Sequence, residues 1–73
     1  MLGKVKTIIC FNPKKRLINI DVDGLATRTY AVEGNRNYKR WENIKVGDYL
    51  TGLEWFDQEA RIIDADSQIS VLK

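Results

Sequence analysis

The sequence predicts an all-β fold, a small closed barrel in which five short strands follow a Greek-key path. Three observations lead to this prediction. Apolar and polar residues alternate with a period of two along most of the chain. Turn residues separate the alternating runs. The 73 residues suffice for a single domain, residues 1–73, and a domain of this size buries only about 60% of its unfolded surface, so a closed sheet with few exposed edges is favoured.

The first half of the chain predicts three strands joined by two turns. The runs 4–11, 16–22 and 27–32 are rich in β-forming residues. The first turn is Asn12-Pro13-Lys14-Lys15, where proline cannot donate to a strand ladder. The second is Asp23-Gly24, because glycine accepts the positive φ of a tight turn.

The alternation also assigns residues to the two faces of each strand. On the first strand one face carries Val5, Thr7, Ile9 and Phe11. On the second strand the apolar face carries Ile18, Ile20 and Val22. On the third strand one face carries Arg28, Tyr30 and Val32.

The second half predicts a link followed by a hairpin. Residues 34–43 show no alternation and too few apolar side chains for a long helix, so we expect a loop or one short helical turn at 38–42. After it we expect a fourth strand, a hairpin tip, a fifth strand and a short continuation or sixth strand, at 48–55, 56–59, 60–65 and 69–72. This order is typical of an OB-type barrel; an SH3-like barrel is the alternative, since it uses five or six short strands in the same length.

Two parts of the chain resemble nucleic-acid-binding OB domains. The opening is similar to that of cold-shock domains, with residues 7–9 as an insertion, in Gly3-Lys4-Val5-Lys6 and Phe11-Asn12-Pro13-Lys14-Lys15. The later part resembles S1-type domains, including the S1-like initiation factor of translation, in Ile44-Lys45-Val46-Gly47-Asp48-Tyr49-Leu50 and Arg61-Ile62. The resemblance implies an OB fold that binds single-stranded nucleic acid. The chain departs from cold-shock domains on the next two strands, because residues 15–20 hold no aromatic residue or glycine and the third strand holds only Tyr30, so we expect limited base stacking.

The composition excludes several classes of function. The chain has no histidine and a single cysteine, Cys10, which excludes Ser–His and Cys–His catalysis, the usual zinc sites and an internal disulfide. The carboxylate pairs Asp21/Asp23 and Asp64/Asp66 do not extend to a calcium-binding loop pattern. No apolar run approaches the length of about 18 residues that a membrane-spanning helix needs. We therefore expect a cytoplasmic, non-enzymatic binding module without cofactor, metal or membrane partner.

Charge is distributed unevenly along the chain. Residues 1–40 carry nine cations and three acids, whereas residues 41–73 carry three cations and seven acids. If the two halves lie on different faces, one face is positive and attracts anionic partners. Alternatively, the two halves neutralise each other across the fold.

The candidate nucleic-acid site combines cations with two tyrosines. The first turn borders the ligand face of an OB barrel, and the link interleaves cations with aromatic rings. The predicted nucleic-acid-binding residues are Lys14, Lys15, Arg16, Arg28, Tyr30, Arg36, Tyr38, Lys39 and Arg40. We expect them to capture single-stranded nucleic acid or RNA through phosphates, with little reading of base edges. Alternatively, these cations belong to an ordinary solvated surface that binds no ligand.

Trp41 is expected to plug one open end of the barrel.

A second hypothesis is a protein-interaction barrel. Trp55 and Phe56 lie beside the predicted hairpin tip, and the surrounding acids Glu54, Asp57 and Glu59 repel phosphate. These rings, or an unpaired strand edge such as 69–72, then bind another protein or a second copy of the chain. Burial of Trp55 is the simpler alternative.

Overall fold

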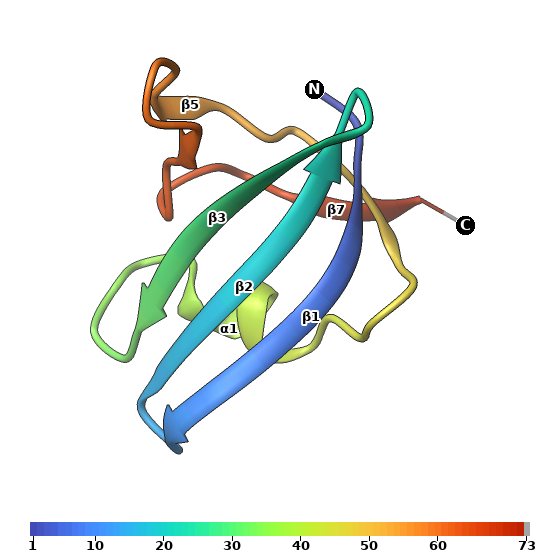
Figure 1. Ribbon diagram of the computed structural model, residues 1–73. Helices are drawn as coiled ribbons and strands as arrows, with labels where there is room; N and C mark the ends of the chain where they lie inside the picture. The colour runs from blue at the N-terminus through green and yellow to red at the C-terminus, as the bar shows by residue number, and fades with distance from the viewer. Residues whose placement is uncertain (73) are drawn as a thin grey trace.

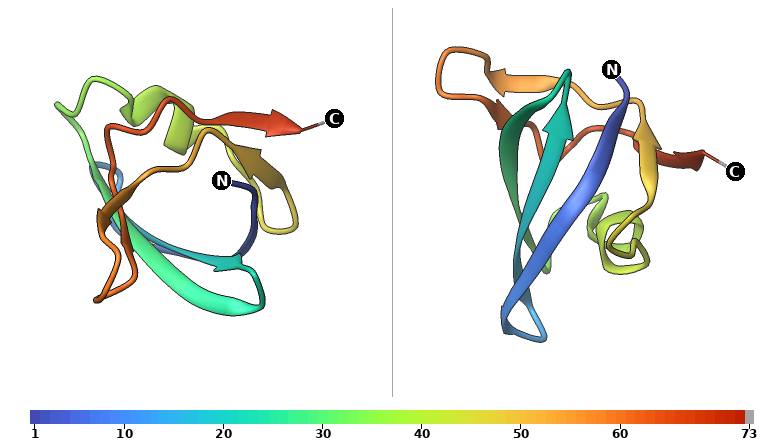
Figure 2. Two further views of the ribbon diagram at one scale, coloured as in Figure 1. Left: turned by 90° about the horizontal axis from the view of Figure 1, so that it is seen from above. Right: turned by 45° about the vertical axis from the view of Figure 1, so that its right-hand side comes forward.

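A computed structural model, which describes residues 1–72, confirms the all-β class. Its elements are β1 (Gly3–Asn12), β2 (Lys15–Val22), β3 (Leu25–Val32), α1 (Tyr38–Glu42), β4 (Tyr49–Thr51), β5 (Trp55–Asp57), β6 (Ile62–Ile63) and β7 (Ser70–Leu72). Across residues 1–72 the strands form one seven-stranded sheet in the order β5-β6-β3-β2-β1-β4-β7. Figures 1 and 2 show that this sheet curls into a half-barrel, with α1 behind its β1–β2–β3 part.

The first three strands form an antiparallel meander, as the alternation predicts. The side chains that point into the core from β2 are Ile18, Ile20 and Val22, and those from β3 are Thr27, Thr29 and Ala31. Arg28, Tyr30 and Val32 share the opposite, exposed face of β3, so the predicted faces of the second and third strands are confirmed.

The predicted face of the first strand is wrong beyond Val5. The pairing of β1 with β2 shifts register between Val5 and Thr7, which leaves Lys6 as an extra residue. Such a β-bulge reverses the side-chain alternation that follows it. Val5 is therefore buried, whereas Ile9 and Phe11 are exposed. A second register shift, between Cys10 and Asn12, leaves Phe11 as an extra residue near the end of β1. Because of the first bulge, one side of the sheet has two apolar residues that the alternation assigns to the face of Val5.

The predicted five-strand count is also wrong. The expected strand at 48–55 divides into β4 and β5 because Gly52 adopts a φ of +81°, and a Cβ there would collide with the backbone carbonyl of Gln68. The expected strand at 60–65 shortens to β6 because Arg61 adopts a left-handed φ of 54° at the end of the preceding loop. The continuation at 69–72 becomes β7, which pairs with β4.

The helical turn at 38–42 is confirmed as α1, and it carries the fully buried Trp41. The indole Nε1–H donates to the carbonyl of Ala65 at 2.8 Å, and the Trp41 carbonyl accepts from Arg16 Nη1 at 2.7 Å. The ring therefore fills the core beneath α1 and connects the helix to Ala65, while the Trp41 backbone carbonyl connects the helix to β2. This placement confirms the prediction that Trp41 is a plug rather than a stacking residue.

One buried hydroxyl in the core has no partner, which predicts a stabilising substitution. Thr29 Oγ1 is buried without a hydrogen bond, whereas Thr27 Oγ1 donates to the carbonyl of Ile20 at 3.1 Å. Replacing a buried, unpaired hydroxyl by a methyl group removes a desolvation cost, so Thr29→Val is expected to raise the free energy of unfolding by about 1 kcal/mol. The matched Thr27→Val variant should lose stability. Urea denaturation measures both, and an equal loss in the two variants would contradict this reading.

Candidate functional site

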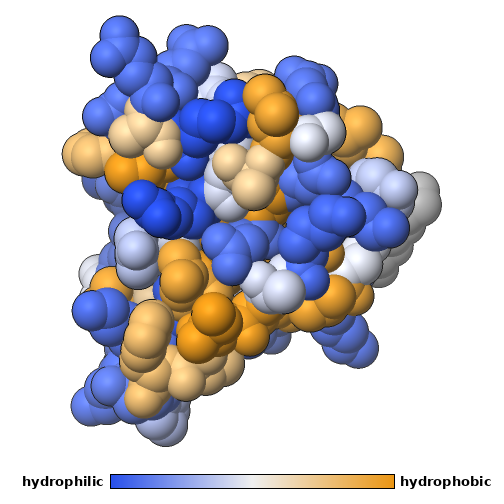
Figure 3. All heavy atoms as spheres, viewed as in Figure 1, coloured by the Kyte–Doolittle hydropathy of each residue, from blue (hydrophilic) through white to orange (hydrophobic). Residues whose placement is uncertain are grey.

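The outer face of the β1–β2–β3 meander carries an exposed apolar patch. We define the apolar patch as Ile9, Phe11, Leu17, Tyr30 and Val32. Leu17 lies between Ile9 on β1 and Tyr30 on β3 in the strand register. The rings of Phe11 and Tyr30 are 58% and 44% exposed. In Figure 3 hydrophobic residues gather at the lower left, over the lower part of this face. Two aromatic rings on one exposed face form a stacking surface for flat ligands.

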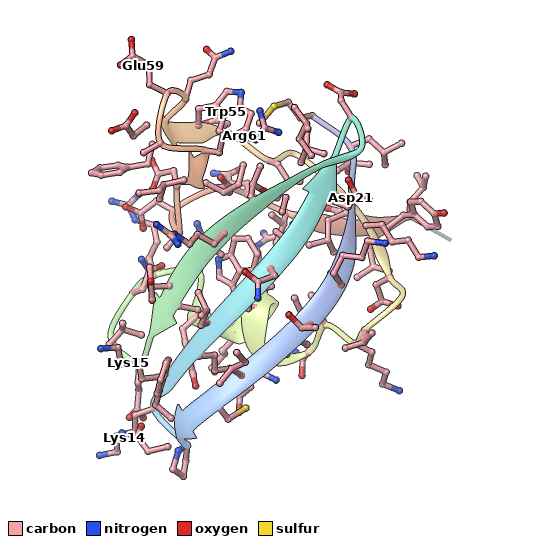
Figure 4. The ribbon with its side chains drawn as sticks, in the orientation of Figure 1. Lys14, Lys15, Asp21, Trp55, Glu59 and Arg61 are labelled. Atoms are coloured by element: carbon pink, nitrogen blue, oxygen red, sulfur yellow. The ribbon has the colours of Figure 1, made fainter. Side chains whose placement is uncertain are left out.

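Cations stand beside both rings. Lys15 Nζ lies 5.7 Å from the centroid of the Phe11 ring. Arg28 is exposed two residues from Tyr30 on the same face of β3. Lys14 lies at the adjoining turn, as Figure 4 shows, with its Nζ 3.7 Å from Glu33 Oε2. This exposed ion pair contributes little to stability, so Lys14 can exchange its carboxylate partner for a phosphate.

The turn and the link, which are separate in the sequence, meet at one end of the sheet. Lys14, Arg36 and Lys39 line a hollow of about 440 Å³, whose wall also includes Glu33 and Glu42. The structure therefore brings together two of the cation groups that the sequence analysis singled out. We call Lys14, Lys15, Arg28, Arg36 and Lys39, together with Phe11 and Tyr30, the basic-aromatic surface.

Three of the predicted site residues have structural partners instead. Arg16 Nη1 donates to the Trp41 carbonyl at 2.7 Å. Tyr38 is buried, and its hydroxyl donates to the carbonyl of Pro13 at 2.6 Å, so the expected stacking role of its ring is wrong for this arrangement. Arg40 Nη1 donates to the carbonyl of Ile69 at 3.0 Å. These side chains attach α1 to β2, to the turn between β1 and β2, and to the segment before β7, and we leave them out of the surface.

Trp55 and Phe56 occupy different environments. Trp55 packs against the core, and the Arg61 guanidinium lies 5.1 Å from its ring centroid. Arg61 also donates to the carbonyls of Val22 and Ala26. Figure 4 shows Arg61 beside Trp55, with Glu59 at the end of the loop. Phe56 by contrast is 74% exposed. Trp55 is therefore part of a structural clamp, and Phe56 alone offers a free ring.

Phe11 and Leu17 are surface residues that the sequence analysis did not assign to the site. Alternation along β1 assigns Phe11 to the same face as the buried Val5, and the bulge at Lys6 reverses it. The period-two pattern carries no signal for this bulge, because the register shift is set by the pairing of β1 with β2 across the sheet.

Comparison of this chain with known proteins finds no relative. No protein-family model, curated protein or solved structure matches the chain. In the part of the chain that the structure describes, no group of three or more cysteines or carboxylates is arranged to hold a metal ion. Over the same residues, no helix has the length and apolar character needed to cross a membrane.

Proposed function

We propose that the fold is of the OB type. The support is the order of the chain: a three-stranded meander, a helix, and then a segment that returns to the edges of that meander. β4 pairs antiparallel with β1, and β6 pairs parallel with β3. β4 and β5 come from one short stretch of chain, so six segments account for the seven strands. The helix after the third strand favours this assignment over the SH3-like alternative.

We propose that the protein is a non-enzymatic module that binds single-stranded nucleic acid or single-stranded parts of RNA. One observation carries this proposal: two exposed rings, Phe11 and Tyr30, stand on one face with Lys15 and Arg28 beside them. Cations that track phosphates and rings that stack on bases are the two elements of single-strand recognition. In OB domains this face and the loop between the first two strands carry the ligand.

The proposed mechanism is electrostatic capture followed by stacking. Lys14, Lys15, Arg36 and Lys39 attract the backbone at the lower end of the face, and Arg28 continues the path upward along β3. Two rings hold two bases at most, so the module discriminates weakly among sequences. The exposed, unpaired Cys10 is consistent with a reducing compartment, and a cytoplasmic location forms part of the proposal.

Replacing Phe11 by alanine tests the stacking part of the proposal. Wild-type protein is expected to bind a fluorescently labelled single-stranded oligonucleotide, with an affinity that falls as salt rises. Because one stacked base contributes about 1–3 kcal/mol, Phe11→Ala should weaken binding by about 5- to 150-fold and leave the salt dependence unchanged. Fluorescence anisotropy across a salt series measures both quantities.

Tyr49→Ala is the control, because it also removes an exposed aromatic ring, and Tyr49 on β4 lies outside the basic-aromatic surface. It should retain the wild-type affinity for the oligonucleotide. If wild-type protein does not bind single strands at low salt and micromolar concentration, the nucleic-acid proposal fails.

A protein-docking role for Phe56 is the second candidate. The ring lines a hollow of about 250 Å³ with Tyr30, Ile62 and Ala65, and the carboxylate in that wall is Asp64. An exposed ring in a mostly apolar hollow is typical of a protein contact, and the acid disfavours phosphate. Phe56→Ala separates the two candidates, since a docking role leaves oligonucleotide affinity unchanged and removes binding to a protein partner.

A further inference from the structure

Strand β1 has a free edge over most of its length. β4 covers only its beginning, where Gly3 and Lys4 pair with Leu50 and Tyr49. The last contacts on that side are the backbone bonds of Val5 with Gly47 and Asp48. From residue 6 to residue 12, among the residues that the structure describes, β1 pairs with β2 alone. Figures 1 and 2 show this lower half of β1 at the open side of the half-barrel.

Between its two bulges, at Lys6 and Phe11, the free edge carries a segment that favours strand pairing. Residues 7–11 are Thr-Ile-Ile-Cys-Phe, strong β-formers without charge or proline. Proteins usually protect an exposed edge with lysine, proline, a β-bulge, a very short strand or a covering loop, and on β1 the bulges and Lys6 stand only at the borders of this segment. The two terminal strands of the sheet follow that rule, because β5 and β7 have three residues each, and β5 ends at the charged Asp57. In β1 the lysines precede residues 7–11, and this segment is the uncharged exception.

We infer that two copies of this chain pair antiparallel through the free edges of β1, in the register centred on Ile9. In this register residue 7 faces residue 11 of the second copy, and no like charges meet inside the uncharged segment. The two-fold axis passes beside Ile9, which is 47% exposed, and joins the apolar patches of both copies into one.

Charge at the border of the pairing is compatible with a second copy. In the register centred on Ile9, Lys6 of one copy lies opposite the uncharged Asn12 of the other, so no like charges meet there. Lys6 keeps its ion pair with Asp21, whose Oδ2 lies 3.6 Å from Lys6 Nζ. The outer faces of the two sheets stay continuous, so the pairing leaves the basic-aromatic surface uncovered and does not depend on the proposed function.

Sedimentation equilibrium from about 10 µM to about 1 mM tests the pairing. Wild-type protein should fit a monomer–dimer equilibrium. Ile9→Lys places two like charges across the axis and should raise the dimer dissociation constant at least about tenfold. The matched control is Val71→Lys, which adds the same charge to the edge strand β7 at a residue that is 39% exposed, and it should leave the equilibrium unchanged. Circular dichroism confirms that both variants are folded.

A cysteine at the axis tests the register directly. In the Ile9→Cys/Cys10→Ser variant, the two new thiols face each other across about 4.5–5.5 Å between Cα atoms, which a disulfide spans. Oxidation should therefore give a covalent dimer, and Val71→Cys/Cys10→Ser should stay monomeric. A wild-type protein that is monomeric throughout the concentration range overturns the inference, as does a dimer that Val71→Lys dissociates and Ile9→Lys does not.

Discussion

Trp41→Ala is expected to unfold the domain. The side chain is fully buried, and truncating a buried aromatic ring costs about 3–5 kcal/mol. The same change leaves the carbonyl of Ala65 without the indole donor at 2.8 Å, a loss of about 1–3 kcal/mol if the carbonyl stays dry. Domains of this size have few kcal/mol to lose. Far-ultraviolet circular dichroism at 25 °C and thermal melting measure the result.

Trp55→Ala provides the comparison, because it removes the same kind of ring from a half-buried position. It should lower the melting temperature less than Trp41→Ala and leave a folded protein. Trp41→Phe should also fold, since it retains an aromatic ring in the core while losing the indole hydrogen bond. A cooperative melt of Trp41→Ala at the wild-type temperature would contradict the assignment of this ring as the plug of the half-barrel.

Removing two cations that flank the rings is expected to have the second-largest effect. Lys15 and Arg28 are exposed, and neither forms an ion pair in the described part of the chain. Each phosphate contact to a single strand adds about 0.7 to the slope of log affinity against log salt, so Lys15→Ala/Arg28→Ala should lower that slope by about 1.4. At about 0.1 M salt this corresponds to a loss of affinity of about 25-fold.

Lys4→Ala/Lys45→Ala is the matched control, because it lowers the net charge by the same amount at exposed residues outside the basic-aromatic surface. Anisotropy titrations at several salt concentrations separate the two variants. If both double variants lose the same affinity and slope, binding follows net charge, and the assignment of the ligand to the outer face of β1–β2–β3 is wrong.

The candidate site was predictable in part. Lys14 and Lys15 follow from a turn signal, and the exposure of Arg28 and Tyr30 follows from alternation along β3. Arg16 and Tyr38 look equally suitable in the sequence, because the sequence does not show which group a cationic or tyrosine side chain contacts in the folded protein. Each has a backbone carbonyl partner that lies 25 residues away along the chain. Such a partner is decided by how α1 docks against the sheet.

The sequence by itself determined the local elements of this protein. Period-two alternation specifies β2 and β3, and proline and glycine specify their turns. The lack of alternation predicts a loop or a short helical turn before β4, and the structure has the helical turn. Only the tertiary structure decided the bulge at Lys6, the break at Gly52 and the exposure of Phe11. The physical reason is the range of the interactions. Alternation and turn preference act over two to four residues, whereas a register is selected by pairing across the whole sheet.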